Sequence, residues 1–132
     1  IADKASLFKN CRKVLVPQGR MVFTDWVASR DLSASEQSIL GDGMAAAGIH
    51  QEAVYQEYIR SAGFASVETE DLSGWWAEIL RERFEMYRSK GEEAGEAFGL
   101  QRFTAFIEAY QVFVEVVEAG KLGGARFTAY SS

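Results

Sequence analysis

The stretch RKVLVPQGRMVFTD, residues 12–25, decides the fold, because it joins the end of a helix, a tight turn and a buried strand. Pro17 fixes φ and Gly19 accepts a positive φ, so the chain turns between them. The residues MVFT at 21–24 are mostly apolar, which is typical of a strand that is covered on both faces. This order of elements predicts an α/β domain.

A helix is expected before the turn, from about Asp3 to Leu15. Asp3 has the side chain of an N-cap residue. Apolar residues recur along one stripe at spacings of three and four, at Leu7, Phe8, Cys11, Val14 and Leu15. Cys11 lies on this stripe, so we interpret it as a buried packing residue. It is the only cysteine, which excludes an intrachain disulfide and favours a cytoplasmic protein.

Two helices and a strand are expected after the first strand. Ser33 and Glu36 have the spacing of a capping box and begin the first of these helices. Glycines weaken its far end, so we expect that end to be broken or mobile; they are Gly41, Gly43 and Gly48. The second helix covers about 51–62, and a strand follows at 64–70.

Residues 72–119 carry no strand signal and contain two amphipathic helical patterns, separated by a glycine-rich connection. A last strand follows at 126–130. We therefore interpret residues 1–132 as a single partial α/β domain, with a helical cap at 72–119 inserted between the last two strands. The strand at 21–24 is apolar enough to be central, yet three strands leave one edge unpaired. Its expected partner is a missing N-terminal half or a second copy of the chain.

The ordered set of these motifs resembles the class I S-adenosylmethionine-dependent methyltransferases. The similarity is strongest with the sarcosine and dimethylglycine N-methyltransferases and extends to the phosphoethanolamine methyltransferases. It rests on the residues at 3–4, 7–8, 12–25, 55, 58, 62–64, 67, 71–73 and 120–124. The resemblance implies the C-terminal half of a Rossmann-like methyltransferase sheet, with three strands and a helical cap.

The chain departs from this family in the part that holds the methyl donor. The family binds S-adenosylmethionine through a glycine-rich loop that follows its first strand. No such pattern occurs here, and the glycines at 41–43 and 120–124 lack a preceding strand and a following helix. S-adenosylmethionine is thus implied for the complete family enzymes, and none is expected to bind this chain alone.

Six residues are candidates for binding an acceptor. Asp25 and Trp26 follow the first strand, at the end of the sheet where ligands of open α/β folds bind. Four more lie in the cap. The electron-rich rings of Trp75, Trp76 and Tyr87 attract cationic amines, and Arg83 is expected to pair with a carboxylate of the acceptor. The alternatives are a strand-end cap for Asp25, core packing for the aromatic residues, and a surface ion pair for Arg83.

His50 is the only histidine, at a predicted helix start. Its ordinary pKa suits proton transfer, although we favour a solvent-exposed capping residue. One histidine and one cysteine argue against a zinc site.

The net charge of −5, without a stripe of Lys or Arg, argues against nucleic acid as a partner. No apolar run is long enough for a membrane span. The first hypothesis is the acceptor-binding half of a small-molecule methyltransferase, acting on an amine and not expected to catalyse alone. The alternatives are a stand-alone dimeric small-molecule-binding module without catalysis, and a structural protein that retains a remnant of the fold. Whether the chain is an enzyme stays open at this point.

Overall fold

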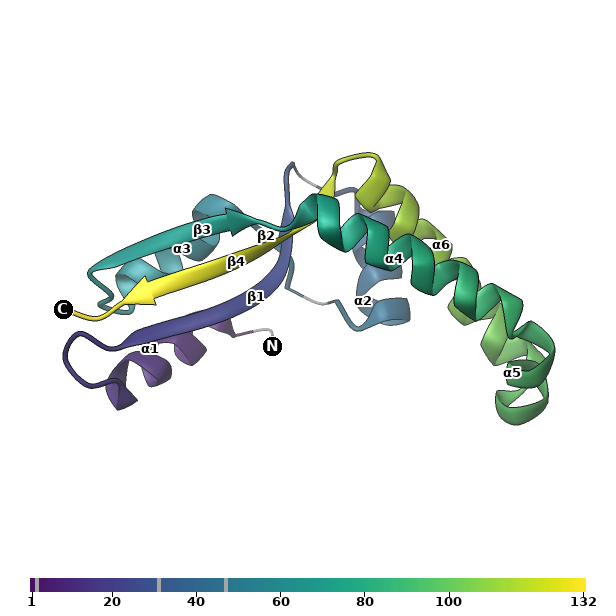
Figure 1. The fold of residues 1–132 in the computed structure, drawn as a ribbon, viewed down its shortest axis with the longest axis horizontal. Helices are drawn as coiled ribbons and strands as arrows, with labels where there is room; N and C mark the ends of the chain where they lie inside the picture. The colour runs from purple at the N-terminus through teal and green to yellow at the C-terminus, as the bar shows by residue number, and fades with distance from the viewer. Residues whose placement is uncertain (2, 31, 47) are drawn as a thin grey trace.

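The computed structural model describes residues 1, 3–30, 32–46 and 48–132, and it contains six helices and four strands in these ranges (Figure 1). Their order is α1 (Lys4–Val14), β1 (Arg20–Ala28), α2 (Ala34–Met44), β2 (His50–Gln51), α3 (Glu52–Ser61), β3 (Ser66–Asp71), α4 (Ser73–Ser89), α5 (Gly91–Phe98), α6 (Leu100–Glu118) and β4 (Leu122–Tyr130). The α/β class is confirmed.

The sheet has the strand order β2-β1-β4-β3. β4 lies between β1 and β3 and runs antiparallel to both. β2 pairs in parallel with the end of β1, joining Val27 to His50 and Ala28 to Gln51. The three expected strands are confirmed. The fourth, β2, was not expected, because two residues carry no sequence period.

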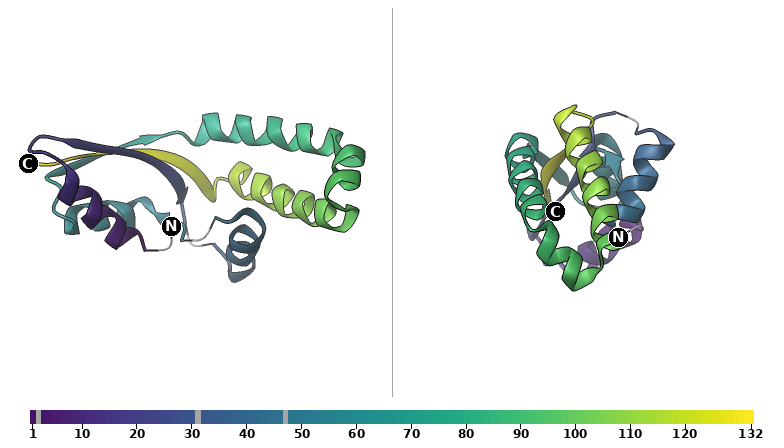
Figure 2. Two further views of the ribbon diagram at one scale, coloured as in Figure 1. Left: turned by 90° about the horizontal axis from the view of Figure 1, so that it is seen from below. Right: turned by 90° about the vertical axis from the view of Figure 1, so that its right-hand side faces the viewer.

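One face of the sheet is covered by α1 and α3, which Figure 2 shows lying side by side beneath it. Side chains that alternate along β1 and β4 enter this layer, and the largest buried members include Phe8, Tyr55 and Phe127. Figure 1 looks onto the opposite face. The alternation of side chains along β1 turns Val22 away from Phe23 and the core beneath the sheet, and 51% of the Val22 surface is exposed. Asp3 caps α1 as expected, since its Oδ1 accepts from the Ser6 N–H at 3.0 Å.

The cap extends beyond the end of the sheet as a long hairpin of α4 and α6, with α5 at its tip (Figures 1 and 2). The cap between β3 and β4 is therefore confirmed. α2 packs against α6 and adds a third long helix to this layer. The cap has its own apolar cluster, which reaches the ends of β1 and β4 through Ala28 and Leu122.

Two expectations about the glycine-rich segments were wrong. The capping box at Ser33 and Glu36 is present, with hydrogen bonds of 2.8 and 3.1 Å, but the helix it begins continues unbroken to Met44. Gly43 lets α6 approach closely, because a Cβ on Gly43 would sit 2.5 Å from Ala109 Cβ. The expected loose connection in the cap contains the short helix α5.

One edge of β1 is largely free. On the side away from β4, only Val27 and Ala28 have strand partners among the described residues, so the edge from Arg20 to Trp26 is unpaired. A groove of about 370 Å³ runs between this edge and α1. Its lining comes from Lys4, Leu7, Phe8 and Cys11 of α1, from Met21 to Asp25 of β1, and from Ile1. An unpaired, mostly apolar strand edge beside a groove is suited to receive another strand.

Candidate functional site

The carboxyl end of β1 places two consecutive predicted residues on opposite faces of the sheet. Asp25 has the same orientation as Phe23 and Val27, toward α1 and α3. Trp26 points the other way, toward the cap. This follows from the period of two along a strand. The structure therefore divides the predicted acceptor site into two groups, one on each face.

On the first face, Asp25 belongs to a strand-end cluster that we define as Lys4, Asp25, His50 and Tyr55. The Asp25 Oδ2 lies 3.3 Å from the Lys4 Nζ and accepts from the Tyr55 hydroxyl at 3.0 Å. The Asp25 Oδ1 accepts from the Trp26 N–H at 2.8 Å. Both carboxylate oxygens are thus occupied, and the negative charge of Asp25 is compensated within the protein.

Lys4 is the most buried charged residue of the cluster, with 5% of its surface exposed. Its ammonium donates to the Gly48 carbonyl at 2.8 Å and to the Ile1 carbonyl at 3.2 Å, besides its ion pair with Asp25. An ammonium has three protons, so these three oxygens satisfy it. Such partners are required because a buried, unpaired charge is very unfavourable.

Tyr55 is fully buried, and its hydroxyl lies 3.0 Å from both the Asp25 Oδ2 and the Trp26 carbonyl oxygen. Burial raises the pKa of Tyr55, and the charge of Asp25 raises it further. The phenol therefore stays protonated at neutral pH and donates a hydrogen bond. This bond holds α3 against the end of β1.

His50 is half-buried in β2, and Gln51 rather than His50 is the N-cap of α3. Its interpretation as a solvent-exposed capping residue was therefore wrong. The ring makes edge contacts with Tyr55 and Tyr58, at centroid distances of 5.9 and 5.6 Å. Burial lowers the pKa of His50, the charge of Lys4 lowers it further, and the charge of Asp25 opposes them. At neutral pH the imidazole is uncharged.

On the second face, Trp26 joins the sheet to the cap. Its ring meets Trp76 of α4 at a centroid distance of 4.6 Å and Phe113 of α6 at 4.7 Å, both edge-on. Such pairs contribute packing energy beyond their buried area. Two of the six predicted residues, Trp26 and Trp76, are thus in direct contact.

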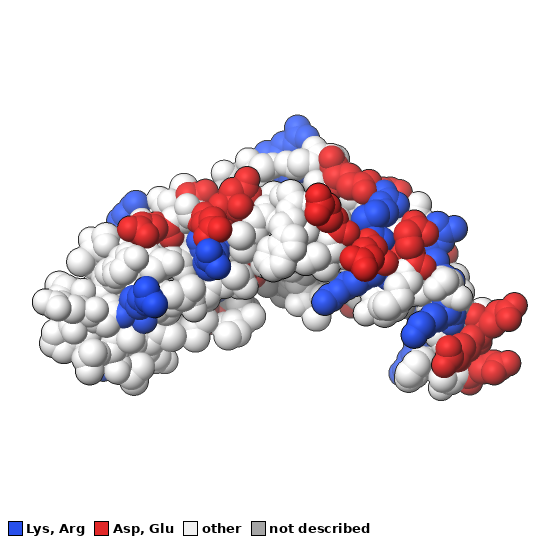
Figure 3. Space-filling model, in the orientation of Figure 1, with Lys and Arg blue, Asp and Glu red and all other residues white. Residues whose placement is uncertain are grey.

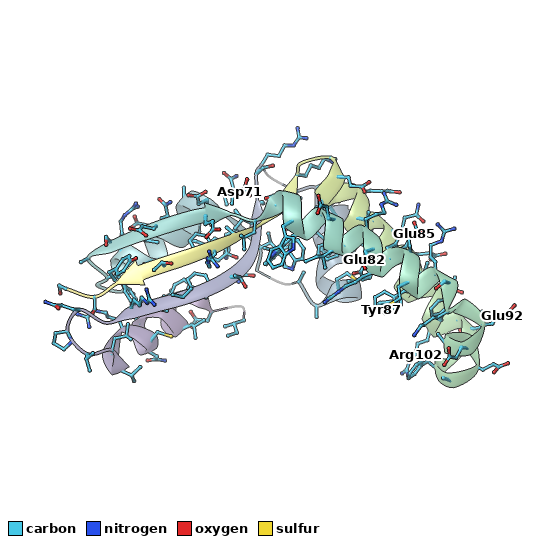
Figure 4. The ribbon with its side chains drawn as sticks, in the orientation of Figure 1. Asp71, Glu82, Glu85, Tyr87, Glu92 and Arg102 are labelled. Atoms are coloured by element: carbon cyan, nitrogen blue, oxygen red, sulfur yellow. The ribbon has the colours of Figure 1, made fainter. Side chains whose placement is uncertain are left out.

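The other predicted cap residues lie outside this contact. Trp75 is 61% exposed, and Arg83 is also exposed. Tyr87 packs edge-on against Phe106 and Tyr110, at 5.4 and 5.5 Å. Figure 4 shows Tyr87 well along the cap, beyond the end of the sheet. The six predicted residues therefore do not form one site in this structure.

Charges on the visible face are concentrated over the cap helices, where acidic and basic side chains alternate (Figure 3). Arg81 of α4 pairs there with Glu118 of α6 at 2.6 Å. Among the described residues, no group of His, Cys, Asp and Glu is arranged to hold a metal ion. None of the helices in these ranges is long and apolar enough to cross a membrane.

A separate hollow of about 570 Å³ lies at the carboxyl ends of β1 and β3. Its polar lining includes Glu52 at the start of α3 and Asp71 at the end of β3. Hydrogen bonds from the hydroxyl and backbone N–H of Ser73 lower the pKa of Asp71. Asp71 is therefore ionised at neutral pH, which suits a polar ligand at this end of the sheet.

The glycines of this chain do not form a cradle for S-adenosylmethionine. A Cβ on Gly123 would fall 1.9 Å from the Ser73 Oγ, and one on Gly124 would fall 2.2 Å from the Trp76 ring. These glycines make room for α4 to cross β4, so protein atoms fill the space beside them. Gly41 and Gly43 lie inside α2. These glycines therefore do not form the loop that cradles the donor in the complete enzymes.

Comparisons with known proteins agree with this architecture. No family model matches the chain. Over 121 residues it is 22% identical to phosphoethanolamine N-methyltransferase 1 of Zea mays, a match that covers 92% of this chain and 24% of that protein.

Three solved structures extend the comparison. A Haemonchus contortus phosphoethanolamine N-methyltransferase 2, in complex with phosphomonomethylethanolamine and S-adenosylhomocysteine, has a TM-score of 0.82 at 19% identity, covering 99% of this chain and 30% of that one. A putative sarcosine dimethylglycine methyltransferase of Galdieria sulphuraria has a TM-score of 0.84 at 20% identity, covering 100% and 48%. The cyclopropane synthase MmaA2 of Mycobacterium tuberculosis has a TM-score of 0.86 at 14% identity, covering 96% and 49%.

The chain spans about a quarter of the curated relative and between 30% and 49% of these three solved structures. Two Haemonchus contortus structures of this fold are complexes with S-adenosylhomocysteine and with S-adenosylmethionine. The sheet order, the cap and the matched region agree, and the chain has the fold of the C-terminal part of the S-adenosylmethionine-dependent methyltransferases.

Proposed function

We propose that this chain is the acceptor-binding part of a small-molecule S-adenosylmethionine-dependent methyltransferase that acts on an amine. The methyl donor is held by a segment outside these 132 residues, on the same polypeptide or on another. The observation that carries this proposal is the unpaired edge of β1, from Arg20 to Trp26, beside the groove along α1. Without its partner segment the chain is not expected to catalyse.

The geometry of this edge favours a parallel partner strand. β2 already pairs in parallel with β1 on this side, at Val27 and Ala28. A strand that occupies the remaining edge in the same direction places its carboxyl end beside the strand-end cluster. Ligands of open α/β sheets bind at the carboxyl ends of parallel strands. The donor and the acceptor would therefore meet at the end of β1.

An amine acceptor is supported by the chemistry of this end of the sheet. Aromatic rings attract amine cations, and Trp26 and Trp76 meet here at 4.6 Å. Asp25 attracts an amine less strongly than an unpaired carboxylate would, because Lys4 already compensates its charge. The names of the relatives also refer to amines, namely phosphoethanolamine, sarcosine and dimethylglycine.

A second candidate function is a stand-alone dimeric binding module, and one observation favours it. The residues around the start of β1 expose apolar side chains, with Val14 at 82%, Val16 at 69% and Val22 at 51% exposed. Two copies that pair along the free edges of β1 would cover such side chains. Sedimentation of the 132-residue chain separates the two candidates, because a strict monomer contradicts the dimeric module.

The role in acceptor binding is tested by a fluorescence titration of the 132-residue chain. Glycine betaine and dimethylglycine are the probes, and 3,3-dimethylbutyrate is the isostere of betaine in which a neutral carbon replaces the cationic nitrogen. Trp76→Leu is expected to abolish the response to the cations, whereas Trp75→Leu, which removes an exposed indole, is expected to keep it. Equal responses to betaine and to the isostere that lacks its cationic nitrogen would contradict an aromatic cation site.

A further inference from the structure

The tip of the cap contains a further pocket, far from the end of the sheet. It lies between α5 and α6, beside the end of α4, and has a volume of about 380 Å³. Aromatic rings make most of its wall, and the lining residues are Tyr87, Ala94, Phe98, Arg102, Phe103 and Phe106. Pockets that hold small molecules measure about 300–1,000 Å³. This pocket is therefore large enough for a small apolar molecule.

The wall of this pocket is almost entirely apolar, although the pocket opens at the surface. Tyr87 packs edge-on against Phe106 at a centroid distance of 5.4 Å, and Phe106 packs in the same way against Tyr110 at 5.6 Å. These contacts hold the inner rings in place. Phe98 lies at the rim, with 70% of its surface exposed. Apolar surface that stays in contact with water gains free energy when a hydrocarbon covers it.

Arg102 adds one cation to this apolar wall. Because nearly all of the wall is apolar, Arg102 contributes the aliphatic part of its side chain, and its guanidinium stands at the rim. Among the residues that the structure describes, no carboxylate lies within ion-pair distance of Arg102. Figure 4 shows Arg102 on the same edge of the cap as Tyr87, whereas Glu92 lies on the other side of the tip. An unpaired guanidinium beside an apolar pocket suits a molecule that joins a hydrocarbon chain to an anion.

We propose that the tip of the cap binds a single-chain carboxylate, with its hydrocarbon between α5 and α6 and its carboxylate on Arg102. The site is separate from the proposed acceptor site. Trp76 lies near the start of α4, where the cap meets the sheet, whereas Tyr87 lies near the end of that helix (Figure 1). Binding at the tip therefore depends neither on methyl transfer nor on the donor segment.

Binding is tested on the 132-residue chain by an NMR titration with octanoate, at concentrations where octanoate is monomeric. The comparison ligands are 1-octanol, which has the same chain without a charge, and octyltrimethylammonium, which carries a cation. We expect saturable shifts of the amide resonances of Phe98, Arg102 and Phe106, with octanoate bound most tightly and the cation most weakly. Equal affinities for the three ligands would overturn the role of Arg102, and the absence of a saturable shift would overturn the site.

Two matched pairs of surface variants test the placement of the ligand. Arg102→Met is expected to weaken octanoate binding by about fivefold and octanol binding much less. Lys90→Met removes another exposed cation of the cap tip, outside this pocket, and is expected to change neither. Phe98→Ala is expected to weaken both ligands, whereas Leu100→Ala removes an equally exposed side chain that does not line this pocket and is expected to keep them. Equal effects within either pair would overturn the placement.

Two other occupants of the pocket would give different results. If a second copy of the chain covers it, the amide resonances of Phe98 and Arg102 will shift with protein concentration without octanoate, and sedimentation will show a dimer. If the tip instead docks on a lipid surface, the chain will sediment with phosphatidylglycerol vesicles while octanoate produces no saturable shift. Either result would overturn the proposal.

Discussion

The indole of Trp76 lies directly against the backbone of Gly124, so that a Cβ at Gly124 would fall 2.2 Å from the Trp76 ring. This contact seats α4 of the cap on β4 of the sheet. We predict that Gly124→Ala destabilises the chain by about 1–3 kcal/mol, because the ring and the strand must move apart. Urea unfolding followed by circular dichroism measures this change.

Gly74 provides the matched control, since it lies in the same helix as Trp76 and an added Cβ meets no atom within 4 Å. Gly74→Ala is expected to be neutral or to stabilise the chain by up to about 1 kcal/mol, because alanine is the better helix former. If both variants behaved alike, the close contact of Trp76 with Gly124 would not determine how the cap is seated.

A second pair of glycines tests the packing of α2 against α6. A Cβ on Gly43 would lie 2.5 Å from Ala109 Cβ, whereas one on Gly41 meets no atom within 4 Å. Gly43→Ala is predicted to cost about 1–3 kcal/mol through overpacking. Gly41→Ala is predicted to stabilise α2 by about 0.5–1 kcal/mol. Thermal unfolding of both variants gives the comparison, and a stabilising Gly43→Ala would mean that the two helices lie further apart.

Lys4 is predicted to be the more important of two ion-paired cations at the sheet. Its side chain is 5% exposed and has three oxygen partners, while Arg126 pairs with Glu70 at the surface, at 48% and 54% exposure. Lys4→Met is expected to lower the free energy of unfolding by about 3 kcal/mol, because it leaves Asp25 and the Gly48 carbonyl without this partner. Arg126→Met is expected to cost less than about 1 kcal/mol. Equal losses of unfolding free energy in the two variants would contradict the greater importance of the three contacts of Lys4.

The stability of the chain is predicted to fall as the pH drops below the ordinary pKa of histidine. The folded state lowers the pKa of His50, so the unfolded chain binds a proton more readily. The neutral imidazole contributes its full stabilisation when the pH is above the pKa of histidine in the unfolded chain, about 6.5. This stabilisation is lost as the pH falls from that value toward the lower pKa of His50 in the folded chain. Urea unfolding at pH 7.5 and 5.5 measures the loss, and His50→Gln is expected to reduce it. An identical loss in that variant would assign the effect to other groups.

Much of the fold could be predicted because the sequence marks its elements locally. The cap residue Asp3 and the capping box at Ser33 each act within a few residues. The turn after Pro17 is also local, although Gln18 and not Gly19 adopts the positive φ. The long apolar pattern of α6 was also predicted from the sequence. Contacts between residues that are far apart in the sequence could not be predicted. The close approach of Ala109 of α6 to Gly43 and the pairing of Val27 with His50 in β2 both join residues that are far apart in the sequence.

The candidate site was only partly predictable, for the same reason. Asp25 and Trp26 could be found because they end a buried strand. Lys4 could not be found in this way. A lysine in the first turn of a helix is usually exposed, and nothing in the sequence indicates that Lys4 is buried or that it pairs with Asp25, 21 residues later. Asp25 and Trp26 are consecutive in β1, so their side chains point to opposite faces of the sheet. The sequence implies this alternation, but it does not show which helices cover each face.

The proposed function is tested most directly by the transfer of a radioactive methyl group from S-adenosylmethionine to sarcosine. It is measured side by side for the natural polypeptide that carries this chain and for the 132-residue chain alone. Transfer is expected from the natural polypeptide and none from the chain alone. Transfer by the isolated chain would contradict the proposal that the donor is held by a segment outside these 132 residues.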